Sequence, residues 1–119
     1  MFSYYNINPE HLRISDCVCR AVSLATDTDY YAVMDLLRDN ASNNQCDCLM
    51  LDCYSKMLDD IGYERKDAEE KTVGELSEEN KDKTLLIRID GHLTCSKQGT
   101  VYDLWDCTSK KADCYWCID

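Results

Sequence analysis

The sequence predicts an α+β fold in which helices come first and an antiparallel sheet follows. Up to about residue 80, apolar side chains recur every three or four positions, which is typical of amphipathic helices. From residue 84 onward, short runs rich in apolar and aromatic residues are separated by turns, which is typical of strands. A block of helices followed by a block of strands favours α+β over the alternating order of a parallel sheet.

The helical part contains four predicted helices. Their ranges are 16–25, 30–40, 50–61 and 72–80. Ser15 or Asp16 is expected to cap the first, since short polar side chains accept hydrogen bonds from a helix start. Gly62 closes the third. Thr72 and Glu75 have the spacing of a capping box at the start of the fourth.

Four strands are predicted in the C-terminal part. Their ranges are 84–90, 92–98, 100–107 and 112–118. A turn at Gly99 is expected to join the second and third strands as a hairpin. A further short extended piece is predicted at "FSYYNI". The chain has 119 residues, one proline and no low-complexity linker, so residues 1–119 are expected to form a single domain with one core.

Charge and hydropathy exclude some classes of function. The formal net charge of −10 argues against a nucleic-acid-binding surface, which needs basic clusters to neutralise phosphates. No apolar run is long enough to cross a bilayer, and the N-terminal residues lack the basic-then-apolar layout of a signal peptide. We therefore expect a cytoplasmic protein with no nucleic-acid or membrane partner.

Nine cysteines are many for this length, but their odd number without an export signal predicts reduced thiols, mostly buried. Three groups have spacings worth testing for zinc: Cys17 with Cys19, Cys46 and Cys48 with Cys53, and Cys114 with Cys117. Only the last has the Cys-x-x-Cys spacing that zinc sites prefer, and it lies in a predicted strand. The sequence thus predicts no metal and no other cofactor, and a zinc-stabilised domain is only a third hypothesis.

One cysteine stands where a nucleophile would be expected. In "SDCVCRAVSLAT", Cys17 occupies the first turn of a predicted helix, where free N–H groups stabilise a thiolate. Arg20 lies roughly on the same face and favours the thiolate, whereas a nearby Asp16 carboxylate opposes it. Cys19 lies about 200° around the helix and should pack elsewhere.

A nucleophilic cysteine needs a base and a group that orients the base. Of the two histidines, His11 lies in an irregular segment and His92 opens a strand, which is a rigid place for a general base. The next strand carries two aspartates in "VYDLWDC". Asp106 is expected to lie closest to His92 across the hairpin, with Asp103 as the alternative. Trp105 would shield the pair from water.

The chain resembles the papain-like cysteine peptidase superfamily, and more specifically small papain-like proteins of bacteria and their phages. The resemblance rests on "DCVCRAVSLAT", "TVGEL", "TLLIRIDGHLT", "VYDLWDC" and "CYWC", in this order. It implies a papain-like fold and a thiol hydrolase acting on a peptide, isopeptide or amide bond through a thioester. It also implies Cys17 as nucleophile, His92 as base and Asp106 as orienting acid.

The resemblance raises a question about the oxyanion hole. The main-chain N–H of Cys17 would supply one donor. Papain-like enzymes usually add a glutamine side chain a few residues before the cysteine, and "NPEHLRIS" has none. Asn8, His11 or Ser15 would have to replace it.

A second hypothesis belongs to a different class: a catalytically weak or inactive papain-like binding module. With a net charge of −10, such a chain would act as a phage or mobile-element effector that occupies a basic surface of a host protein. The segment that would make this contact carries four glutamates: Glu69, Glu70, Glu78 and Glu79. Neutralising them should abolish binding, whereas Cys17→Ala should not.

Overall fold

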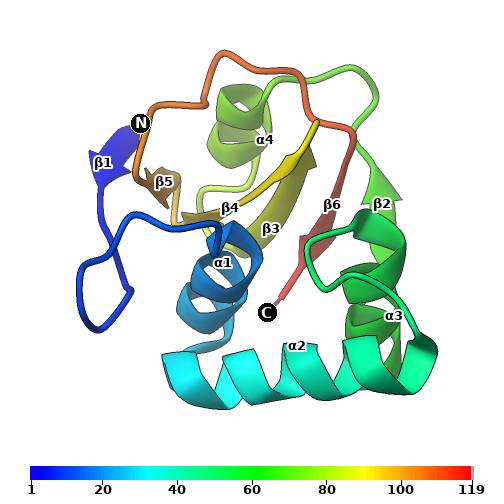
Figure 1. Cartoon of the computed structure of the whole chain (residues 1–119). Helices are drawn as coiled ribbons and strands as arrows, with labels where there is room; N and C mark the ends of the chain where they lie inside the picture. Colours follow the sequence, from blue (N-terminus) through cyan, green and yellow to red (C-terminus); the bar gives the residue numbers. More distant parts are fainter. Residues whose placement is uncertain (119) are drawn as a thin grey trace.

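The computed structural model describes residues 1–118 and is an α+β protein, as the change of pattern along the sequence predicts (Figure 1). The helices are α1 (Cys17–Thr26), α2 (Tyr30–Asn44), α3 (Leu51–Ile61) and α4 (Val73–Glu79). The strands are β1 (Phe2–Tyr4), β2 (Arg65–Asp67), β3 (Thr84–Ile89), β4 (His92–Lys97), β5 (Thr100–Asp103) and β6 (Cys114–Cys117).

Helix ends follow the local signals in the sequence. Thr72 accepts a hydrogen bond from the N–H of Glu75, and the Glu75 carboxylate accepts one from the N–H of Thr72, so the predicted capping box is present. Gly62 ends α3 with φ at 111°, a conformation that glycine adopts without strain. Helix α2 runs past its predicted end at Asn40, because the polar residues after it lie on an exposed helical face.

The sheet has the order β1-β5-β4-β3-β6-β2. The pairs among β3, β4, β5 and β6 are antiparallel, and β4 and β5 form the predicted hairpin. The expectation of a wholly antiparallel sheet is wrong, because β1 pairs with β5 in parallel. Strand β5 also ends at Asp103, before the predicted limit at residue 107.

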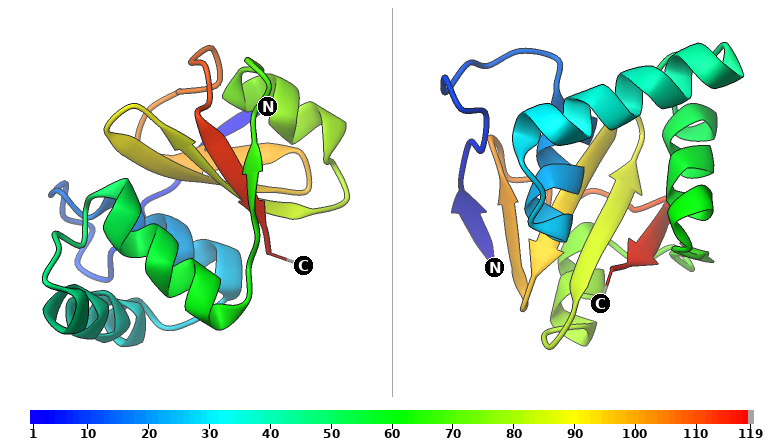
Figure 2. Two further views of the ribbon diagram at one scale, coloured as in Figure 1. Left: turned by 90° about the vertical axis from the view of Figure 1, so that its right-hand side faces the viewer. Right: turned by 90° about the horizontal axis from the view of Figure 1, so that it is seen from below.

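Helices cover both faces of the sheet rather than one (Figure 2). Helices α1 to α3 pack on one face, around the fully buried Trp116 and Tyr54. Helix α4 packs on the other, where Val73 and Leu76 meet Leu85 of β3. The central strands β3 and β4 therefore bury residues of both parities, which explains the apolar run from Leu85 to Ile87 in β3. Among residues 1–118, no helix is long and apolar enough to span a bilayer.

The cysteines differ from the expectation of reduced thiols in one place. Cys46 and Cys53 form a disulfide that links the segment after α2 to the first turn of α3. The pair with zinc-like spacing, Cys114 and Cys117, lies on β6 with its side chains on opposite faces of the sheet, in different cores. These two thiols cannot chelate one ion together.

Candidate active site

Three elements meet at one end of the sheet and bring together residues far apart in the sequence. Cys17 is the first residue of α1, His92 the first of β4 and Asp103 the last of β5. Because β4 and β5 are antiparallel, the start of one lies beside the end of the other. Helix α1 packs across β4, which places the half-buried Cys17 near His92.

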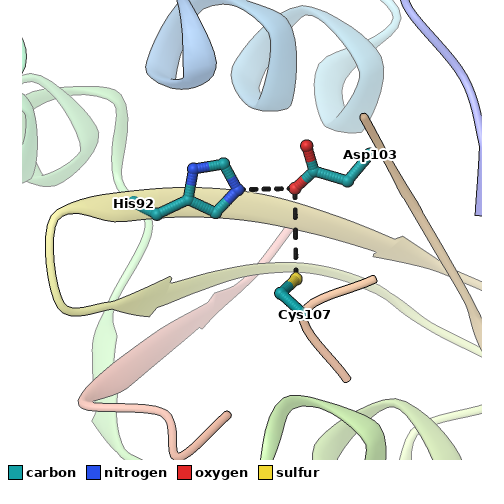
Figure 3. A group of neighbouring side chains, drawn as sticks. All are labelled: His92, Asp103 and Cys107. Carbon is teal, nitrogen blue, oxygen red and sulfur yellow. Dashed lines mark hydrogen bonds and ion pairs between the residues drawn. The ribbon is translucent and has the colours of Figure 1, made fainter. Parts of the chain in front are cut away.

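The imidazole of His92 is held by Asp103. Its Nε2 lies 2.6 Å from the Asp103 Oδ2, and the Asp103 side chain is 2% exposed (Figure 3). Burial raises the pKa of Asp103, but the hydrogen bond and the positive charge of His92 outweigh it and leave the pKa lowered. An ionised carboxylate only accepts, so Nε2 donates the proton and Nδ1 is the nitrogen left for Cys17.

The pKa values of the thiol and the imidazole move toward each other. Burial raises the pKa of Cys17, but hydrogen bonds from His92 and the Leu93 backbone, with the charges of His92 and Arg20, lower it overall. Burial lowers the pKa of His92, but hydrogen bonds to Asp103 and Cys17 raise it to about 9. Both shifts favour a thiolate beside an imidazolium, the reactive form of a nucleophilic cysteine.

The choice of Asp106 as the aspartate nearest His92 is wrong, because Asp103 makes that contact. Cys95 pairs with Tyr102, so the next pair along the hairpin sets Thr94 beside Asp103, and Thr94 shares a strand face with His92. Asp106 has the opposite parity and follows the end of β5. Its carboxylate is exposed and accepts hydrogen bonds from the N–H and hydroxyl of Thr108, as in an Asx turn.

Asp103 is also fixed from a second direction. Its Oδ1 accepts a hydrogen bond from the N–H of Leu104 at 2.7 Å and lies 3.3 Å from the Arg20 Nη1. The Nε of the same guanidinium donates to the Asp16 Oδ1 at 2.6 Å. Arg20 thus joins two buried carboxylates, one at the start of α1 and one at the end of β5.

Asp16 precedes α1 but does not cap it. Its carboxylate accepts hydrogen bonds from Arg20, from the Tyr30 hydroxyl at 2.7 Å and from the Asn8 amide at 3.0 Å, and none from the helix backbone. The N–H groups of the first turn, beginning with Cys17, have no side-chain cap. An uncapped helix start beside a thiol can stabilise an oxyanion.

The three side chains that could replace a glutamine donor differ in their surroundings. Asn8 is buried, and its amide donates to Asp16 and Tyr30. His11 and Ser15 are exposed. Backbone N–H groups are therefore the oxyanion donors that this end of α1 provides.

Trp105 lies over the imidazole, as expected from its position between the two aspartates. The ring centroids of Trp105 and His92 are 5.1 Å apart, at a tilt of 46°. Trp105 is 41% exposed, so it covers His92 from the solvent side. Such cover strengthens the electrostatic interactions of the imidazolium by excluding water.

Cys17 lies between two hollows. One, of about 140 Å³, is lined by Leu49, Met50, Tyr54 and Asp90 together with Cys17 and His92. The other, of about 10 Å³, lies on the β5 side of Cys17, where Tyr5 and Tyr102 contribute to its lining. A molecule whose reacting carbon sits over the thiol therefore finds room on the side of Leu49 and Met50, whereas the β5 side has space for about one water.

One group of potential metal ligands exists among residues 1–118. Side-chain atoms of His92, Asp103 and Cys107 lie within 4.8 Å of one another (Figure 3). Burial and the charge of Asp103 raise the pKa of Cys107 to about 11, whereas zinc binds the thiolate. Arg20 already places a positive charge on the same carboxylate. The group is better described as a thiol directed at Asp103, with a sulfur-to-oxygen distance of 4.0 Å.

Comparisons with models of protein families, with curated proteins and with solved structures find no significant match for this chain. The candidate site is therefore defined by geometry alone. Sequence reasoning placed Arg20 near the thiol but missed that it joins Asp16 to Asp103. Part of that signal was present, since Asp16 and Arg20 have the i, i+4 spacing of a helical ion pair.

Proposed function

We propose that this chain is a small papain-like thiol hydrolase, a cysteine peptidase or amidase, with Cys17 as nucleophile, His92 as base and Asp103 as the group that orients the base. One observation carries the proposal: a half-buried thiol at an uncapped helix start interacts with an imidazole that is itself hydrogen-bonded to a buried carboxylate. This arrangement of nucleophile, base and orienting group is the general form of covalent acyl transfer.

The reaction follows from the protonation states. The Cys17 thiolate attacks the carbonyl carbon of an amide, a peptide or an isopeptide, and the carbonyl oxygen becomes an oxyanion near the first-turn N–H groups. His92 gives its Nδ1 proton to the nitrogen of the leaving amine, the carbon–nitrogen bond breaks and a thioester remains. His92 then takes a proton from water, whose hydroxide attacks the thioester and releases the acid and the thiolate.

The larger hollow supports an amide substrate with an apolar group on one side of the reacting carbon. The larger hollow contains Leu49 and Met50, which are 43% and 55% exposed. Exposed apolar side chains beside a reactive group are typical of ligand-binding surfaces. One part of the substrate, the acyl group or the leaving amine, can therefore occupy this hollow beside Cys17.

The proposal is tested by alkylating the reduced protein with iodoacetamide between pH 5 and 9 and mapping each modified cysteine by mass spectrometry. At pH 6, Cys17 is expected to react faster than every other cysteine, because an ordinary thiol is protonated at that pH. His92→Ala should remove this reactivity. His11→Asn is the matched control, because it alters the other histidine and Asn tolerates the positive φ of 55° at that position.

A second experiment tests acyl transfer itself. Wild-type protein treated with p-nitrophenyl acetate should release one equivalent of p-nitrophenol in a burst and carry an acetyl group on Cys17. The thioester should then hydrolyse in wild type and persist in His92→Ala if it forms there at all. A Cys17 that titrates like the other thiols and gives no burst would overturn the proposal.

The binding module remains the second candidate, favoured by the lack of a side-chain oxyanion donor. Its acidic segment is partly neutralised, because Glu79 pairs with Lys71 and Glu78 with Lys81, at 2.7 and 2.6 Å. A variant with all four glutamates of that segment changed to glutamine should lose affinity for a basic partner if this candidate is correct. Cys17→Ala should keep that affinity.

A further inference from the structure

We propose that Arg20 is a positioning residue that holds the Asp103 carboxylate in place for His92, with Asp16 as its fixed anchor. The inference rests on the proposed function, since it assigns a role within the same site. It goes beyond it by assigning roles to two residues outside the set of Cys17, His92 and Asp103.

The contacts of the guanidinium define the geometry. Its Nε meets Asp16 and its Nη1 meets Asp103, at 2.6 and 3.3 Å. Both carboxylates are nearly fully buried, and the Arg20 side chain is 10% exposed. A planar guanidinium presents its N–H groups in a fixed fork, so its orientation on Asp16 sets the direction of the bond to Asp103.

Asp16 is itself immobilised. The Tyr30 hydroxyl and the Asn8 amide both bind its Oδ2, while Arg20 binds its Oδ1. Tyr30 belongs to α2 and Asn8 to the segment before α1, so three parts of the chain hold this carboxylate. The anchor is therefore rigid, and the position of Asp103 is defined relative to α1, the helix that carries Cys17.

Stability alone does not explain this arrangement. Replacing a buried ion pair by apolar residues is often neutral or stabilising, because desolvation of the charges offsets their attraction. Using Asp16 in this way also leaves the start of α1 without the stabilising side-chain cap that an aspartate at this position usually provides. What the Arg20–Asp16 ion pair provides instead of stability is a fixed placement of His92 and Asp103 relative to the thiol of Cys17.

A positioning role and a purely electrostatic role predict different changes in the pKa of His92. The titratable and charged groups that face Asp103 are His92 from β4, Arg20 from α1 and Cys107 from the segment after β5, and Cys17 from α1 also faces His92. If Arg20 acted only as a charge, its removal alone would raise the pKa of His92, and its removal together with the opposite charge of Asp16 would leave that pKa nearly unchanged. If Arg20 positions Asp103, either change weakens the hydrogen bond to Nε2 and lowers the pKa of His92.

The experiment follows the His92 imidazole by nitrogen-15 NMR, with each variant made both in the wild-type chain and in Cys17→Ser. The Cys17→Ser background makes the NMR readout independent of thiol chemistry, and the wild-type background is used for alkylation of Cys17. The main variant is Asp16→Asn with Arg20→Gln, which removes both charges and leaves no unpaired buried ion. Arg20→Lys keeps one charge without the fork. Arg13→Gln is the matched control, because Arg13 is exposed.

We expect wild type and Arg13→Gln to show a slowly exchanging Nε2–H resonance. The double variant should lose it, titrate His92 at lower pH and alkylate Cys17 about tenfold more slowly at pH 6. Arg20→Lys should lie between them. If the double variant fails to fold, the Nε2–H resonance in Arg20→Lys carries the test.

A folded double variant that keeps the resonance, or in which His92 titrates at the same or a higher pH than in wild type, overturns the inference. That result is distinct from failure of the proposed function, which would show as an unreactive Cys17 in wild type whatever happens to the Nε2–H signal.

Discussion

The starts of α1 and α4 have the same backbone problem and solve it differently. At α4, Thr72 and Glu75 satisfy the free N–H groups with a complete capping box. At α1, Asp16 stands in the capping position, but its carboxylate binds Arg20, Tyr30 and Asn8 instead. The α4 start is closed and serves stability, whereas the α1 start is left open beside a thiol.

The surroundings of the two helix starts differ in the same way. Beneath α4, the buried layer is mostly apolar and includes Val73, Leu76 and Leu85. Beside the start of α1, the buried groups are ionised or hydrogen-bonded, with Arg20, His92 and Asp103 in contact. Changes near α4 should therefore alter the free energy of unfolding, and changes near α1 should alter reactivity.

The largest expected effect comes from Leu76→Ala, in the apolar layer of α4. Leu76 is 2% exposed, so the variant leaves a cavity and should lower the free energy of unfolding by about 3 kcal/mol in urea titrations. Alkylation of Cys17 in the folded protein should keep its rate and pH profile. A change in that profile would show that the packing around α4 also influences the reactivity of Cys17 at the start of α1.

The second-largest effect should come from Asp103→Asn, which removes the negative charge that stabilises the His92 imidazolium. Alkylation of Cys17 at pH 6 should slow about a hundredfold, because the thiolate loses its partner. Asp106→Asn is the matched control on the same segment and should react like wild type. Equal slowing in both variants would mean that the contact between Asp103 and His92 does not determine the reactivity of Cys17.

The third prediction concerns pH. Burial lowers the pKa of His92, but the hydrogen bonds to Asp103 and Cys17 raise it to about 9, above the value of about 6.5 in the unfolded chain. The stability that His92 contributes is full below pH 6.5 and is lost as the pH rises through 9.

Urea titrations at several pH values measure this contribution. The difference in unfolding free energy between wild type and His92→Gln should shrink by about 2 kcal/mol between pH 6 and 9.5, allowing for solvent screening. A difference that grows with pH would contradict the assignment of a charged imidazole.

The smallest effect should come from Thr72→Ala at the closed helix start. Loss of the cap should lower the free energy of unfolding by about 1 kcal/mol, measured in urea, with Cys17 reactivity unchanged. Thr72→Ser keeps the hydroxyl and should restore most of the stability. Full stability in Thr72→Ala would show that α4 does not depend on its cap.

The sequence was informative wherever the signal was local. The C-terminus of α3 and the N-terminus of α4 were predicted because Gly62, Thr72 and Glu75 act on backbone groups within a few residues. Cys17 and His92 were placed correctly at the start of a helix and of a strand for the same reason.

Features that depend on which segments come into contact in the fold were missed. The alternation in "VYDLWDC" continues past the point where β5 ends, so the sequence could not show that Asp103 rather than Asp106 faces His92. The disulfide between Cys46 and Cys53 was also not predicted, because spacing alone does not define which cysteines pair.

The parallel pairing of β1 with β5 has a consequence for how the protein folds. Phe2 pairs with Val101, and the N–H of Tyr5 donates to the carbonyl of Asp103 at 3.0 Å, so this contact spans most of the chain. Contacts between such distant residues form slowly, because a long loop must close first. During synthesis, the first strand must wait until β5 has left the ribosome. The strand that carries Asp103 thus gains its edge partner only once nearly the whole chain has been made.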